Sequence, residues 1–141
     1  MSRHMTYDIS GVGADRLANK NRMIGLMLQC IRLAGMKILA GPYVLDTGSM
    51  DPNPGLTGWT VLTTSHISIH TFLKQGTAFI DLFSCKEYDP DKVESVVRKW
   101  FNCESLKVVE VARAEMAMFP EEDNVIRYAF KAQPSSTLER I

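Results

Sequence analysis

Consecutive β-type runs occupy the middle of the chain, and this feature constrains the fold most strongly. Residues 57–64 and 66–72 carry β-branched side chains at alternate positions, and residues 77–84 follow the turn signal Lys74-Gln75-Gly76. Alternation of this kind is typical of strands with one buried face. The middle of the chain is therefore expected to form neighbouring strands of one sheet.

Helical and further strand patterns flank these runs. Apolar residues recur at helical spacing over residues 16–36, with Asp15 as a candidate cap and Gly35 as a candidate stop. A second helix is expected over residues 90–101, opened by Asp89-Pro90. Three more strands are expected over residues 4–12, 37–46 and 106–112, and residues 47–56 read as a loop.

The order of these elements predicts the fold class. We expect an α+β fold, a two-layer αβ sandwich whose mostly antiparallel sheet carries two helices on one face. Pro42 indicates an edge strand or an irregularity in the strand over residues 37–46. The other face of the sheet would then be left for a partner subunit. The tail from residue 116 to residue 141 shows no clear period and stays unassigned.

Composition narrows the class of protein. A chain of 141 residues, 45% of them apolar, is expected to form one domain. Its net charge is zero, which argues against a protein that binds nucleic acid through phosphate contacts. No apolar stretch approaches a membrane span, and the start of the chain lacks a signal-peptide core. Three cysteines without CxxC spacing argue against a metal site or a disulfide framework. A cytoplasmic location is expected.

Hydroxyl and imidazole side chains interleave with isoleucines over residues 63–71 (TTSHISIHT). One interpretation is structural: Ile67 and Ile69 point inward, and His66, Ser68 and His70 form an ordinary polar surface. On composition alone, this interpretation is the stronger one. The alternative is that the segment carries chemistry.

The chemical interpretation rests on a resemblance. Residues 64–71 (TSHISIHT) and residues 78–85 (AFIDLFSC) resemble the bacterial and archaeal S-adenosylmethionine decarboxylases. That family has a Glu-Ser-His-x-x-Ile-His-Thr segment, followed at this separation by an Asp-Leu/Val-Phe-Thr-Cys segment. The resemblance extends over about residues 3 to 113. It implies a decarboxylase-like domain over residues 1–115, cut by its own chemistry between residues 64 and 65.

The resemblance implies a covalently bound cofactor made from the chain itself. The Ser65 hydroxyl would attack the carbonyl of Thr64, and elimination and hydrolysis would leave a pyruvoyl group at position 65. Such a group forms a Schiff base with a substrate amine and accepts the electrons released with carbon dioxide. By matched position, His70 is the processing base, Thr57 replaces a serine that assists processing, and Cys85 is the proton donor. We interpret Cys30 and Cys103 as structural residues. We assign no chemical step to His66.

The spacing of two of these residues raises a geometric question. Positions 65 and 70 differ by an odd number, so a straight strand would aim their side chains at opposite faces. Either the chain turns at Ser65, or processing frees that end to move.

Several positions depart from the family pattern. Thr64 stands where the family has glutamate, and Lys86 where glycine is usual. After His70 the family has Thr-Trp-Pro-Glu, whereas this chain has Thr71-Phe72-Leu73-Lys74. Phe72 can still stack on an adenine ring. Lys74 can only donate hydrogen bonds. Near Asp51 an adenine-stacking aromatic is missing. An acid such as Asp51 or Asp46 facing the pocket would suit a cationic substrate tail, although a solvated turn is the plainer interpretation of each.

Three functions remain open at this point. The first is a pyruvoyl-dependent decarboxylase of polyamine biosynthesis that converts S-adenosylmethionine to its decarboxylated form. The second keeps the chemistry with L-arginine or L-ornithine as substrate. The third is a homologue that does not process itself and acts as a binding or regulatory subunit. The resemblance also implies a homodimer with active sites between protomers. The charge balance and the lack of a long apolar stretch argue against nucleic acid or membrane partners.

Overall fold

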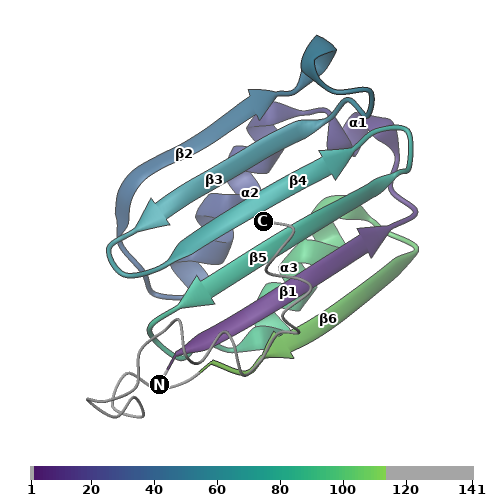
Figure 1. The fold of residues 1–141 in the computed structure, drawn as a ribbon. Helices are drawn as coiled ribbons and strands as arrows, with labels where there is room; N and C mark the ends of the chain where they lie inside the picture. Colours follow the sequence, from purple (N-terminus) through teal and green to yellow (C-terminus); the bar gives the residue numbers. More distant parts are fainter. Residues whose placement is uncertain (1, 114–141) are drawn as a thin grey trace, which may run out of the picture.

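Residues 2–113 are described by a computed structural model, in which six strands form one fully antiparallel sheet (Figure 1). The strand order across the sheet is β2-β3-β4-β5-β1-β6. The strands are β1 (Arg3–Ser10), β2 (Ile38–Asp46), β3 (Leu56–Leu62), β4 (His66–Phe72), β5 (Thr77–Ser84) and β6 (Ser105–Val111). The predicted strands over residues 66–72 and 77–84 are thus confirmed at both ends. The tail over residues 116–141 lies outside the described residues.

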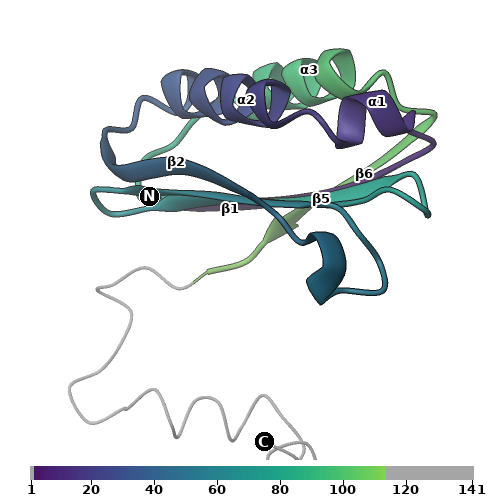
Figure 2. The same ribbon diagram turned by 90° about the horizontal axis from the view of Figure 1, so that it is seen from above.

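The helices lie on one side of the sheet, as Figure 2 shows. They are α1 (Ala14–Leu17), α2 (Lys20–Leu33) and α3 (Pro90–Phe101), and a short 3-10 turn, η1 (Gly48–Met50), lies between β2 and β3. This arrangement confirms the predicted α+β class with its helices on one face. Among the described residues, no helix is long and apolar enough to cross a membrane.

The single helix predicted over residues 16–36 is wrong in one respect, because the chain breaks it into α1 and α2. Asn19 adopts an extended backbone between them, and its side chain accepts a hydrogen bond from the backbone N–H of Arg22 at 3.1 Å. Asn19 therefore caps the longer helix, not Asp15. Gly35, at a φ of +66°, follows the helix end as predicted, and Asp89 caps α3.

The core lies between the helices and the inward face of the sheet. Alternate residues of β4 and β5 are buried there, so the period of two read from the sequence sets the covered face. These residues are Ile67, Ile69, Thr71, Ala78, Ile80, Leu82 and Ser84. They pack beneath buried residues of α2 and α3 such as Met27, Val93 and Val97.

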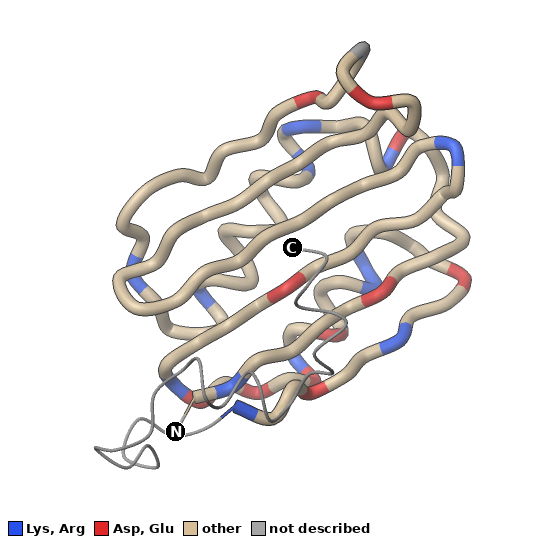
Figure 3. The backbone as a smooth tube through the Cα atoms, viewed as in Figure 1, with Lys and Arg blue, Asp and Glu red and all other residues tan. Residues whose placement is uncertain are grey.

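The opposite face of the sheet carries large apolar side chains that are exposed in the single chain. They are Tyr43, Leu45, Val61, Phe79 and Val109. Figure 3 shows that β3 and β4 carry no Lys, Arg, Asp or Glu. An apolar face of this kind is typical of a surface that a partner covers.

The strand β2 forms one edge of the sheet, as Pro42 indicated. Its register against β3 shifts between Ala40 and Tyr43, the stretch that contains the proline. Proline has no N–H to donate to a ladder and is therefore confined to edges and irregularities.

Candidate active site

The predicted cleavage point lies in the tight turn between β3 and β4. The backbone N–H of Leu62 donates to the carbonyl oxygen of Ser65 at 2.9 Å, so the chain reverses direction just before β4. Ser65 is 8% exposed, whereas Thr64 beside it is exposed. The chain therefore turns just before β4, and Ser65 keeps the buried alternation of Ile67 and Ile69, whereas His70 lies on the open face.

Cys85 holds this turn through two hydrogen bonds. Its backbone N–H donates to the Ser65 Oγ at 2.9 Å, and its Sγ donates to the Thr64 carbonyl oxygen at 2.8 Å. Residue 85 directly follows β5, the neighbour of β4 in the sheet, and this pairing brings the two sequence segments together. The hydroxyl, the carbonyl of the predicted scissile bond and the thiol thus lie in one small cluster.

This cluster contains two of the groups that an acyl shift uses, a nucleophile and a donor to the carbonyl oxygen. A donor on a carbonyl oxygen stabilises the negative charge that develops there when a nucleophile adds to the carbon. The thiol of Cys85 is placed as such a donor, and the Ser65 hydroxyl lies beside the same carbonyl. Neither of these two hydrogen bonds involves a base that could accept the proton of the Ser65 hydroxyl.

His70 lies toward the other end of β4 from Ser65. Its Nδ1 is 3.1 Å from the Oγ1 of Thr57, its partner across the β3–β4 ladder. The strand rises through four residue steps from His66 to His70, a span of about 13 Å, and Ser65 lies one residue before His66. His70 of the same chain therefore cannot reach the Ser65 hydroxyl. His70 and Thr57 thus lie side by side, whereas Ser65 and Cys85 form a separate cluster at the other end of β4.

Phe72 and Asp51 have different surroundings. The ring of Phe72 meets that of Phe79 edge-on, with centroids 5.7 Å apart, at the His70 end of the open face. Asp51 is exposed in the connection between β2 and β3, where its Oδ1 accepts a hydrogen bond from the N–H of Asn53 at 2.7 Å. Asp46 similarly accepts from the N–H of Gly48. Both aspartates thus stabilise local turns.

The structure reveals two acids that the sequence interpretation missed. Asp8 and Asp81 line a groove of about 220 Å³ on the open face, together with Ser68, His70 and Phe79. The signal was available, since both acids occupy positions on the solvent side of alternating strands. The missing information was that β1 inserts beside β5, far from its neighbours in the sequence.

A group of rings lies on the open face close to Ser65. His66 and His4 both contact the ring of Phe83, with centroid distances of 5.8 Å in each case. His4 Nε2 is 3.8 Å from the Oδ1 of Asp81. Burial lowers the pKa of His4, although the Asp81 carboxylate opposes that shift. Among the described residues, no group of three or more His, Cys, Asp or Glu side chains is arranged to hold a metal ion.

Comparison with known proteins identifies the family. A family model described as S-adenosylmethionine decarboxylase matches residues 3–114. The chain belongs to the S-adenosylmethionine decarboxylase family. This membership confirms the resemblance read from residues 64–71 and 78–85, and with it the predicted enzyme class, a pyruvoyl-dependent carboxy-lyase.

Individual relatives agree at modest identity, as expected for a divergent member of the S-adenosylmethionine decarboxylase family. The chain is 30% identical over 124 residues to the S-adenosylmethionine decarboxylase proenzyme of Pyrobaculum arsenaticum, covering 86% of this chain and 92% of the relative. It is 25% identical over 126 residues to that of Pyrococcus furiosus, with 89% and 84% covered.

A solved structure agrees with the fold. The adenosylmethionine decarboxylase from Aquifex aeolicus VF5 superposes with a TM-score of 0.67 at 24% identity, covering 88% of this chain and 97% of that one. The two chains thus share the same fold.

Proposed function

We propose that the chain is a proenzyme that cuts itself between Thr64 and Ser65 and then decarboxylates S-adenosylmethionine. The products would be carbon dioxide and decarboxylated S-adenosylmethionine, an aminopropyl donor of polyamine biosynthesis. One observation carries the proposal: Cys85 donates to the Thr64 carbonyl oxygen at 2.8 Å and, through its N–H, to the Ser65 Oγ at 2.9 Å. Family membership supplies the reaction class.

The processing step balances without an outside oxidant. The Ser65 oxygen adds to the Thr64 carbonyl carbon and loses its proton to a base, and the C–N bond breaks as the nitrogen gains a proton. Loss of the Cα proton of residue 65 then breaks the Cβ–O bond and releases residues 1–64 with a carboxylate end. Water replaces the nitrogen of the remaining unsaturated residue as ammonia, which leaves a pyruvoyl group on residue 65.

The residues around position 65 fit this group. A pyruvoyl group there supplies a carbonyl that binds the substrate amine and accepts the electrons released with carbon dioxide. Ser65 is nearly buried in a turn, which limits access of water. Cys85 lies within hydrogen-bond distance of this turn, and its thiol is the group that we propose returns a proton to the substrate carbon.

The base for processing is proposed to come from a second copy of the chain. His70 is held by Thr57 but lies too far from Ser65 of its own chain. A two-fold axis between two facing sheets, perpendicular to β4, brings the Ser65 end of one copy against the His70 end of the other. The exposed apolar side chains Tyr43, Val61 and Phe79 support such a face-to-face homodimer.

A second substrate class is favoured by one specific observation. The groove that contains His70 also contains Asp8 and Asp81, whose carboxylates suit the guanidinium or ammonium tail of L-arginine or L-ornithine. Lys74 donates to the carbonyl oxygen of Pro52 at 3.1 Å and cannot accept from ribose hydroxyls. The aromatic pair of Phe72 and Phe79 suits an adenine ring instead.

Two measurements test the proposal in sequence. The denatured mass of the purified protein should show two fragments, residues 1–64 and 65–141, of roughly 7 and 9 kDa when the mass is shared by length. Release of carbon dioxide is then measured separately with S-adenosylmethionine, L-arginine and L-ornithine. If carbon dioxide is released only from L-arginine or only from L-ornithine, the proposed substrate is wrong and the proposed mechanism stands.

A chain that stays whole at 15.8 kDa and releases no carbon dioxide would overturn the proposal. It would then favour the remaining alternative, a homologue that binds or regulates an active partner. Thr64, in place of the family's glutamate, is the departure that makes this outcome worth testing.

A further inference from the structure

Arg3, at the start of β1, contacts both ends of the short segment that carries Cys85. In the β1–β5 ladder Arg3 lies opposite Ser84, the last residue of β5 and the one directly before Cys85. The Nη1 of the Arg3 side chain donates to the backbone carbonyl oxygen of Tyr88 at 2.6 Å. The backbone of Arg3 thus pairs at one end of residues 84–88, and its side chain binds the other end.

The guanidinium of Arg3 is itself held in place. Its Nε donates to the Oε1 of Glu110 on β6 at 3.0 Å, and its Cζ lies 6.0 Å from the centroid of the Tyr88 ring. The Arg3 side chain is 23% exposed, so the contact is partly shielded from solvent. A guanidinium presents its N–H groups in one rigid plane, and bonds to two acceptors therefore fix its direction. The Tyr88 carbonyl is tied in this way to β1 and β6.

Burial holds the ends of this segment and not its middle. Ser84 and Tyr88 are buried, whereas residues 85–87 between them are exposed. The Lys86 N–H donates to the Ser84 Oγ at 3.0 Å, which is a bond within the segment. The position of the Cys85 thiol therefore depends on how firmly the two ends are fixed to the sheet.

We infer that Arg3 is a positioning residue for Cys85. The inference rests on the proposed function, in which the Cys85 thiol stabilises the Thr64 carbonyl and returns a proton to the substrate. By fixing the Tyr88 carbonyl, Arg3 keeps the thiol at its 2.8 Å hydrogen bond to Thr64. A displacement of about 1 Å at a reacting group can lower a rate about 100-fold, so loss of this contact should affect turnover more than substrate binding.

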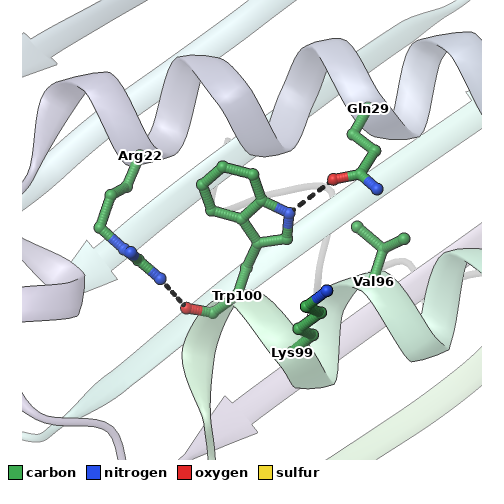
Figure 4. A pocket seen from close by; sticks show the side chains of 5 residues that line it. All are labelled: Arg22, Gln29, Val96, Lys99 and Trp100. Carbon is green, nitrogen blue, oxygen red and sulfur yellow. Dashed lines mark hydrogen bonds between the residues drawn. The ribbon is translucent and has the colours of Figure 1, made fainter.

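Arg22 makes a similar contact elsewhere in the molecule and provides a control. Its Nη2 donates to the carbonyl oxygen of Trp100 at 2.7 Å, and its Cζ lies 5.2 Å from the centroid of the indole ring. Figure 4 shows this contact between α2 and α3. The same carbonyl also accepts from the Nη1 of Arg16 at 3.0 Å. Trp100 lies at the far end of α3 from Tyr88, so Arg22→Met removes an arginine–carbonyl contact without touching the segment that carries the thiol.

Turnover of the cut enzyme is the first test. Arg3→Met keeps an unbranched side chain and removes every donor of the guanidinium. Its kcat should fall about tenfold and its KM should stay within about threefold of the parent, because the thiol acts on substrate that is already bound. Arg22→Met should keep both constants within about twofold. Equal losses in the two variants, or a parent-like kcat in Arg3→Met, would overturn the inference.

Alkylation of Cys85 gives a second measurement that needs no catalysis. Iodoacetamide is applied to the uncut Ser65→Ala chain, and peptide mapping separates Cys85 from the other two cysteines. The reactive form of a cysteine is the thiolate, which cannot donate to the Thr64 carbonyl. Adding Arg3→Met should therefore raise the alkylation rate about fivefold, the effect of weakening one hydrogen bond. Adding Arg22→Met should leave the rate within about twofold.

The two measurements separate failure of this inference from failure of the proposed function. A parent chain that stays whole and releases no carbon dioxide would overturn the proposed function, whereas faster alkylation in Arg3→Met alone would still support the positioning of Cys85. Glu110→Gln is a second variant, which weakens the hold on the guanidinium and should raise alkylation about threefold. Parent-like alkylation in a folded Arg3→Met or Glu110→Gln chain, checked by circular dichroism, would overturn the inference even if the parent is active.

Discussion

The thiol of Cys85 donates a hydrogen bond to the backbone carbonyl oxygen of Thr64, with 2.8 Å between Sγ and oxygen. The two residues are 21 positions apart, and the β4–β5 pairing brings them together. The contact gives one side chain access to two steps of the proposed chemistry. It can stabilise the carbonyl during processing, and it can return a proton during turnover.

Replacement of Cys85 should separate these two steps. Cys85→Ala is expected to cut itself, more slowly than the parent, and then to decarboxylate about 10²–10⁴-fold more slowly, because a positioned acid contributes a factor of that size. Cys85→Ser keeps a hydrogen-bond donor but is a far weaker acid. It should therefore process like the parent and turn over poorly. Fragment yield and carbon dioxide release are measured on each variant, and normal turnover in Cys85→Ala would exclude this proton donor.

Mixed dimers should show that His70 serves the opposite chain. Ser65→Ala and His70→Ala are each expected to stay whole when expressed alone. When the two are co-expressed with different tags, the His70→Ala chain should be cut, because its partner supplies the imidazole. Denatured mass spectrometry identifies the cut chain. If neither chain is cut in the mixed dimer, the base does not act between copies.

The hydrogen bond between Thr57 and His70 should matter for processing. Thr57→Val has nearly the same shape but lacks the hydroxyl that lies 3.1 Å from the His70 Nδ1. It should slow self-cleavage about tenfold, the size expected for one orienting hydrogen bond to an imidazole. Thr57→Ser keeps the hydroxyl and should restore the rate. Equal cleavage rates for the two variants would show that the hydroxyl has no part in processing.

Thr71 is expected to be a structural residue in spite of its place beside His70. Its buried hydroxyl donates to the Leu17 carbonyl oxygen at 2.9 Å and accepts from the Leu56 N–H at 2.8 Å. Thr71→Val leaves both groups unsatisfied and should lower the free energy of unfolding by about 2–4 kcal/mol. Urea denaturation is measured in the uncut Ser65→Ala background. Thr60→Val is the control, because Thr60 is equally buried and its hydroxyl donates to the sulfur of Met27, a weak acceptor, at 3.6 Å.

Acid should destabilise the fold partly through His4. Burial lowers the pKa of His4 in the folded chain, so below about pH 6.5 the unfolded chain takes up a proton that the folded chain does not. Stability is therefore expected to fall as the pH drops through this range. His4→Gln should show a smaller loss of thermal midpoint between pH 7.5 and pH 5 than the parent. A loss as large as that of the parent would assign the acid sensitivity to other groups.

Much of the fold could be predicted from local patterns. The period of two over residues 66–72 and 77–84 fixed both strands and their buried faces, because alternation is a property of the strand itself. The break at Asn19 was missed, since apolar spacing continues across it and only the cap geometry ends one helix and starts the next. The positions of Asp8 and Asp81 on one face required the strand order, which no local pattern contains.

The sequence by itself determined the family and the candidate residues. The segments over residues 64–71 and 78–85 contain the serine, the histidine and the cysteine at fixed separations. A sequence motif gives only the separation of these residues along the chain. Only the tertiary structure decided which of them meet. The sheet joins Cys85 to Thr64 and Ser65 at one end of β4, and Thr57 to His70 toward the other. The physical reason is the length of an extended strand, which keeps residues five positions apart out of hydrogen-bond reach however close they stand in the motif.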